Sequence, residues 1–123
     1  MKTLSFDLEE RLVDFGVRII RLSEALPKIG AGKHLGMQLL RSGTSPAAIY
    51  GEAQGAESRA DFVHKMKIGL KELRESHVWI QMIERAGLIQ PAERLSTIRN
   101  ECHELISIFV SSIKTAKRNN DRA

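Results

Sequence analysis

The chain has 123 residues, of which 42% are hydrophobic and 28% are charged. This balance is typical of one globular domain and excludes a disordered chain. No window approaches the roughly 20 apolar residues of a membrane span, and the N-terminus lacks a secretory signal, so we expect a cytoplasmic protein with no membrane partner. The single cysteine, Cys102, excludes a disulfide within the chain, and the net charge of +4 permits nucleic acid as a partner without requiring it.

The first predicted element is an amphipathic helix. Apolar residues recur at helical spacing from Leu8 to Leu26. Asp7 stands where an N-cap is expected, and Pro27 and Gly30 close the segment.

The second element spans about 33–56 and contains a proline. The helical phase is kept across Ser42–Pro46, which favours one continuous helix over two helices joined by a loop. Pro46 removes one hydrogen bond and clashes with the carbonyl of Ser42, so we expect a bend there. The alternative is a real break with Thr44 or Ser45 as a new cap, because a residue before proline avoids helical angles. The residues assigned to the kink are Ser42, Gly43, Ser45 and Pro46, with Ser42 and Gly43 small enough for a neighbouring helix to come close.

Two further helices complete the chain. The third begins at Ser58 or Asp61 and ends at Gly87, and the fourth opens with Pro91 in its first turn and keeps an apolar stripe to Ile113. Four helices with short connections predict an all-α protein, an antiparallel up-down-up-down four-helix bundle over residues 1–117. Residues 118–123 are expected to form a flexible basic tail.

The first and third predicted helices carry apolar residues outside the face that points to the core. A monomeric bundle needs one apolar stripe per helix, so the second strips indicate a surface covered by another subunit. Scattered exposed aliphatic residues are the alternative, but tryptophan is enriched at the centres of interfaces. The predicted interface between copies consists of Val13, Val17, Ile20, Ile68, Trp79 and Ile83.

Basic residues follow the third helix at spacings that place them on one face. Such a stripe neutralises phosphates, so it indicates nucleic-acid binding, with an ordinary solvated charged face as the alternative. The predicted nucleic-acid-binding residues are Lys67, Lys71, Arg74 and Arg85 on the third helix, and Lys114, Lys117 and Arg118 near the C-terminus.

No residue pattern indicates catalysis. Cys102 lies on the apolar stripe of the fourth helix, where a buried thiol is inert, and His77 lies on the core face of the third. A metal-binding bundle requires carboxylates from the first two helices that match Glu-x-x-His pairs on the others, and these are not evident. We therefore expect no metal, no cofactor and no enzymatic activity.

Three long segments, Phe6–Leu22, Gln38–Ala53 and Asp61–Ile80, together with the closing SIKTAKR, resemble the bacterial four-helix-bundle proteins encoded in intervening sequences of 23S ribosomal RNA genes. The resemblance implies an antiparallel bundle that commonly assembles as a homopentamer and has no known catalytic activity. The accessory protein of diversity-generating retroelements is similar in fold, and it binds nucleic acid and a reverse transcriptase. The sequence departs from the family at Ile49, where asparagine is common.

These observations lead to two functional hypotheses. The first is a homo-oligomeric bundle that binds structured RNA or DNA through its basic surfaces, with ribosomal RNA as a candidate. The second is a protein-interaction scaffold, or an accessory subunit of a nucleic-acid enzyme such as a reverse transcriptase.

Overall fold

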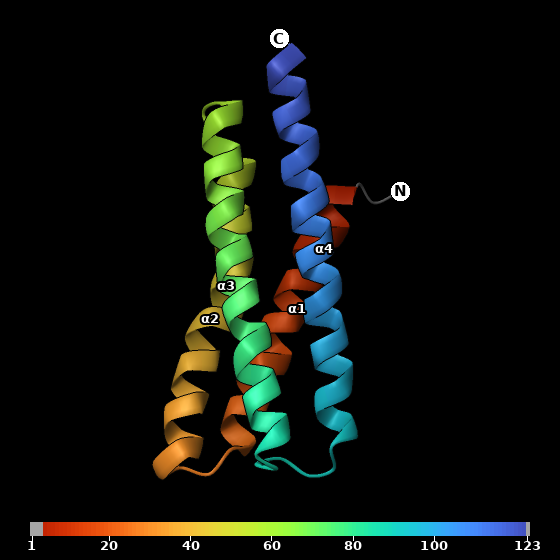
Figure 1. Ribbon diagram of the computed structural model, residues 1–123. Helices are drawn as coiled ribbons and strands as arrows, with labels where there is room; N and C mark the ends of the chain where they lie inside the picture. The colour runs from red at the N-terminus through yellow and green to blue at the C-terminus, as the bar shows by residue number, and fades with distance from the viewer. Residues whose placement is uncertain (1–3, 123) are drawn as a thin grey trace.

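Four α-helices make up nearly all of the computed structural model, which describes the backbone of residues 4–122 and the side chains of residues 7–119. Figure 1 shows that α1 and α2 are joined at the lower end, α2 and α3 at the upper end, and α3 and α4 at the lower end. The predicted all-α bundle is confirmed, with no strand in residues 4–122. The helices are α1 (Leu4–Ala25), α2 (Gly30–Gln54), α3 (Arg59–Arg85) and α4 (Glu93–Arg122).

The two ends of α3 follow the signals in the sequence. The hydroxyl of Ser58 accepts a 3.0 Å hydrogen bond from the backbone N–H of Asp61, which makes Ser58 the N-cap. Gly87 has a φ of 66°, and the N–H of Leu88 bonds back to the carbonyl of Ile83 over 3.2 Å. This is the hydrogen bond of a Schellman motif, so Gly87 ends the helix as predicted.

Two predicted helix starts are wrong. Asp7 lies inside the first turn of α1, because that helix already begins at Leu4. There the carboxylate faces the positive end of the helix dipole without capping it. Pro91 precedes α4, which begins at Glu93, and the Gln90–Pro91 peptide bond is cis. The carbonyl of Pro91 accepts from the N–H of Arg94 in a turn that leads into the helix.

The α2 helix runs through Pro46 without interruption, so the alternative of a break at this point is wrong. It begins three residues earlier than predicted and ends two residues earlier. The hydroxyls of Thr44 and Ser45 each donate a 2.6 Å hydrogen bond to a carbonyl one turn back, on Leu40 and Arg41 respectively. These residues are therefore compatible with the helix interior. The bend at Pro46 stays a prediction.

Small residues on α2 allow two neighbouring helices to approach it. A Cβ atom added to Gly43 would lie 2.7 Å from Cγ1 of Ile19 on α1, which is too close for any side chain. On the other side, the buried hydroxyl of Ser42 accepts a 2.8 Å hydrogen bond from Ser76 on α3. The expectation that Ser42 and Gly43 mark a close helix approach is confirmed.

The core is mainly aliphatic, with Phe15, Phe109 and Tyr50 also buried in it. The α3 helix lies between α2 and α4, and α1 has its smallest contact with α4. Ile49 is half-buried beside α3, where a Cβ on Gly69 would lie 3.4 Å from its Cγ2 atom. This apolar contact lies at the position where the family resemblance implies asparagine. Within residues 4–122, no helix has a stretch long and apolar enough to cross a lipid bilayer.

Candidate functional site

The basic stripe of α3 is exposed to solvent. Lys67, Lys71 and Arg74 are all exposed, and none of them forms an ion pair with a carboxylate of residues 7–119. Other basic residues are paired: Arg41 of α2 binds Glu72 and Glu75. The further ion pairs join Arg11 to Glu101 and Glu104, Lys65 to Asp61, and Arg99 to Glu84. The cations on the stripe therefore remain available to an external anion.

The structure brings Lys67 of α3 next to Lys117 of α4. The side chain of Lys117 lies close enough to that of Lys67 to lower the pKa of Lys67, first by competing for its proton and then by its positive charge. Two neighbouring ammonium groups repel each other, and a shared oxyanion would remove the repulsion. Sequence spacing placed these residues on separate helices and gave no sign that they meet.

The other predicted basic residues differ in their distance from Lys67 and Lys117. Lys114 and Arg118 are exposed on the same part of α4 as Lys117. Arg85 lies 18 residues beyond Lys67 on α3, about 27 Å along the axis at 1.5 Å per residue, so it does not join the cluster. Residues 118–122 continue α4 as helix, and the flexibility of this end stays a prediction. We call Lys67, Lys71, Arg74, Lys114, Lys117 and Arg118 the α3–α4 basic surface.

An apolar surface lies over α1 and α2. The predicted residues Val13, Val17 and Ile20 are exposed on α1, with half of the Val13 surface accessible. Two exposed residues of α2, Met37 and Leu40, line a groove of about 400 Å³ together with Ile20. These two residues were not predicted, because the predicted second strips lie on the first and third helices. We call these five residues the α1–α2 apolar face.

The predicted apolar strip of α3 needs a correction. Ile83 is completely buried in the core, since α3 packs between α2 and α4 and buries a wide face. Ile68 is exposed as predicted. Trp79 is half-buried against the core, its indole N–H donates to Glu75, and its ring meets that of His34 edge-on at 6.4 Å.

Two further exposed side chains, Val78 and Met82, accompany Ile68 on α3. We call these three residues the α3 apolar face. In residues 4–122 no Cα atom of α1 lies within 8 Å of a Cα atom of α3, so this face and the α1–α2 apolar face lie on helices that are not direct neighbours.

Cys102 and His77 have structural environments. The thiol of Cys102 is buried and donates to the carbonyl of Leu73 over 3.3 Å, and burial raises its pKa to about 12. His77 is half-buried and hydrogen-bonded to Gln81; burial lowers its pKa, as do His103 and Arg99. Among the described side chains, no three His, Cys, Asp or Glu residues lie close enough to hold a metal ion.

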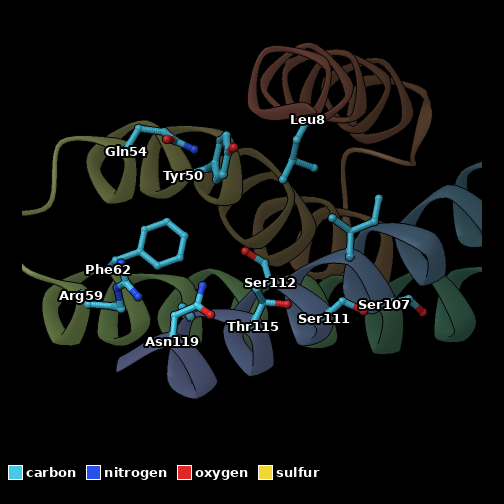
Figure 2. A pocket seen from close by; sticks show the side chains of 12 residues that line it. Leu8, Tyr50, Gln54, Arg59, Phe62, Ser107, Ser111, Ser112, Thr115 and Asn119 are labelled. Carbon is cyan, nitrogen blue, oxygen red and sulfur yellow. The ribbon is translucent and has the colours of Figure 1, made fainter. Parts of the chain in front are cut away.

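A groove of about 870 Å³ is lined by residues of all four helices at the end of the bundle that holds the start of α1 and the last turns of α4. Figure 1 shows that α4 extends past the start of α1. Figure 2 shows Leu8 of α1, Tyr50 of α2 and Phe62 of α3 around the groove, with a row of small polar side chains from α4. That row is Ser107, Ser111, Ser112, Thr115 and Asn119. The row repeats at helical spacing on the side of α4 away from Lys117, a pattern that went unnoticed in the sequence.

Comparisons with known proteins show which family the chain is similar to. Residues 6–111 match the family model described as 23S rRNA-intervening sequence protein. The chain is also similar to a protein of unknown function from the S23 ribosomal protein family of Bacteroides thetaiotaomicron, with 35% identity and a TM-score of 0.78. That match covers 87% of this chain and 98% of the other. None of the curated proteins matches the chain.

Proposed function

The chain belongs to the family of 23S rRNA-intervening sequence proteins, and from the surfaces described above we propose that it is a non-enzymatic, self-associating bundle that binds structured RNA or DNA. Ribosomal RNA is the first ligand to test, and the cytoplasm is the expected compartment. The α3–α4 basic surface makes the contacts with phosphates.

The exposed cations of the α3–α4 basic surface, which form no ion pair with a carboxylate of residues 7–119, carry this proposal. Surface lysines are usually neutralised by nearby carboxylates or separated from one another by water. Here two ammonium groups from different helices adjoin each other, and Lys71 and Arg74 continue the positive charge along α3. A phosphate backbone that follows α3 would neutralise these charges in turn and release its own counterions.

The proposed contacts supply affinity rather than sequence recognition. Lysine meets phosphate as a point charge, and the α3–α4 basic surface contains no exposed aromatic ring on which a base can stack. Binding should therefore depend on the density of phosphates and on helix shape, and it should weaken steeply as salt is added.

The test compares two variants with the same change in charge. Lys67→Glu/Lys71→Glu reverses the basic surface, and Lys28→Glu/Lys33→Glu reverses two exposed lysines near the start of α2. With a structured fragment of 23S rRNA in about 100 mM salt, the first variant should lose at least about tenfold in affinity and the second much less. Equal losses, or no binding by the unaltered protein at low salt, would contradict the proposal.

Self-association is proposed through the two apolar faces. A ring requires two different surfaces on each subunit, one for each neighbour, whereas a two-fold dimer needs one surface that pairs with itself. The α1–α2 apolar face and the α3 apolar face are distinct and would suit a ring. Five subunits is the number that the family resemblance implies.

A second candidate function uses the same apolar faces. If they bind another protein instead of a second copy, the chain acts as an interaction scaffold or an accessory subunit of a nucleic-acid enzyme. Exposed aliphatic residues on both faces favour a protein contact of some kind. Sedimentation of the purified protein separates the two functions, since a monomer at micromolar concentration favours the scaffold.

A further inference from the structure

A second cluster of cations lies between α1 and α4, away from the α3–α4 basic surface. Arg18 and Arg21 of α1 and Arg94 of α4 line a depression of about 230 Å³. Its apolar side is formed by the buried Leu22 and Ile98. No feature of the sequence marked these arginines, because they belong to helices more than 70 positions apart.

The charges in this cluster differ from those two turns away on the same pair of helices. There Arg11 of α1 meets Glu101 of α4, with Nη2 and Oε1 2.6 Å apart. Seven residues further along α1, Arg18 instead meets the hydroxyl of Thr97 at 3.0 Å, and Arg94 lies one turn before Thr97. The interface between α1 and α4 therefore pairs opposite charges at Arg11 and Glu101, and two turns away it brings together three positive charges.

The three guanidinium groups have no anionic partner in the chain as described. None of them forms an ion pair with a carboxylate of residues 7–119. Positive charges gathered around one depression oppose each other, and the contact between α1 and α4 is the smallest among the contacting helix pairs of residues 4–122. A bound anion would turn this repulsion into attraction.

Thr97 holds one arginine in place. Its hydroxyl accepts from Arg18 and donates to the carbonyl of Arg94 over 3.3 Å, so it orients Arg18 toward the depression. Arg94 and Thr97 belong to the first turns of α4, where the positive end of the helix dipole adds to the field. Guanidinium groups bind oxyanions through paired N–H donors, which suits a tetrahedral phosphate better than a monovalent halide.

The size of the depression limits the ligand. Pockets for drug-sized molecules usually measure about 300–1,000 Å³, so 230 Å³ is suited to one phosphate group rather than a whole nucleotide. We infer that Arg18, Arg21 and Arg94 form a binding site for a single phosphate group. The phosphate comes either from a small phosphate-bearing solute or from a nucleic-acid strand, which would have to extend about 34 Å along α4 to reach Lys117 as well.

Titration of the full chain with inorganic phosphate, in chloride buffer of matched ionic strength, tests the site. Isothermal titration should give saturable binding, and Arg21→Gln/Arg94→Gln should lower the affinity at least tenfold. Lys28→Gln/Lys33→Gln removes the same charge at two exposed lysines near the start of α2 and should leave phosphate binding unchanged. Equal affinity in the unaltered protein and Arg21→Gln/Arg94→Gln, or no saturable binding to the unaltered protein, would overturn the inference.

A charge reversal adds a readout that does not depend on the ligand. Arg94→Glu places a carboxylate opposite Arg18 and Arg21, as Glu101 stands opposite Arg11. Without phosphate this variant should melt about 2–4 °C above the unaltered protein, and phosphate should no longer raise its Tm. A lower Tm without phosphate would contradict the like-charge arrangement on which the site depends.

The source of the phosphate is found with a structured RNA fragment and the same glutamine variant. If Arg21→Gln/Arg94→Gln loses both phosphate and RNA affinity, the phosphate belongs to the nucleic-acid backbone. If RNA affinity is unchanged while phosphate binding is lost, the ligand is a small phosphate-bearing solute. Both results are compatible with the phosphate site. The phosphate titration itself tests whether the site exists.

Discussion

Ser76 of α3 donates a 2.8 Å hydrogen bond to Ser42 of α2, and both side chains are completely buried. The single hydroxyl proton of Ser76 serves either this bond or one to the carbonyl of Glu72, 3.0 Å away in its own helix. A hydroxyl pair at this position satisfies its own polar atoms while keeping the space between α2 and α3 small. Ser42 therefore has a structural role in the contact between these helices.

A double-mutant cycle measures this pair. Ser42→Ala and Ser76→Ala should each lower the free energy of unfolding by about 1 kcal/mol, since each leaves a buried hydroxyl with fewer partners. The double variant should lose less than the sum of the two, by about 0.5–1 kcal/mol, because no hydroxyl remains unpaired. Urea unfolding monitored by circular dichroism provides the three values, and strict additivity would show that the bond has no energetic weight.

Two glycines of α2 should respond in opposite directions to alanine. In Gly43→Ala the new Cβ lies 2.7 Å from Ile19, so α1 must shift and the free energy of unfolding should fall by about 1–3 kcal/mol. In Gly51→Ala the Cβ meets nothing within 4 Å, and the reduced freedom of the unfolded chain should stabilise the protein by up to about 1 kcal/mol. Thermal melting of both variants checks the contrast, and a shared direction would contradict it.

Local signals in the sequence were sufficient for much of the fold. The cap at Ser58 and the stop at Gly87 depend on bonds within a few residues, so sequence alone located both. The two predicted helix starts were wrong because a helix start depends on the residues before it. At Asp7 the preceding residues extend the helix to Leu4, and at Pro91 the chain forms a separate turn before α4. Ile83 was misassigned because periodicity finds an apolar residue without showing how wide a face the neighbouring helices cover.

The candidate sites were less predictable because they depend on pairs of helices. Spacing along α3 identified Lys67 and Lys71 as neighbours on one face, but the contact of Lys67 with Lys117 requires the packing of α3 against α4. The same holds for Arg21 and Arg94, which share a depression although each looks like an ordinary surface cation in the sequence. Sequence periodicity gives the direction of a side chain around its own helix and does not give its neighbours from another helix.

The thiol of Cys102 should resist alkylation in the folded protein. Burial raises its pKa to about 12 from the ordinary value of 9.0, so roughly a thousandfold less thiolate is present near pH 8. Labelling with iodoacetamide at pH 8, followed by mass spectrometry, should be very slow in the native state and rapid in concentrated guanidinium chloride. Equal rates in the two conditions would show that the helix interface opens around this cysteine.

Acidification should destabilise the fold through His77. Burial, His103 and Arg99 lower its folded pKa, so between the folded and unfolded pKa values the unfolded chain binds more protons. Stability should therefore fall as pH decreases from about 7 through the lowered pKa. His77→Gln should weaken this dependence in urea unfolding at several pH values, whereas His64→Gln, at an exposed position of α3, should leave it unchanged. An identical pH dependence in His77→Gln would assign the effect to other groups.

Mixing two assembly variants should show whether the subunits associate through different faces. Val17→Glu places a charge on the α1–α2 apolar face, and Ile68→Glu does so on the α3 apolar face. If one face binds the other, each variant alone should sediment as a monomer, since its intact face meets only a damaged one. A mixture should form dimers and nothing larger, because one contact joins the two intact faces and the remaining faces are both charged. If each face instead pairs with itself, both variants should form dimers on their own, which would replace the ring by a chain of two-fold contacts.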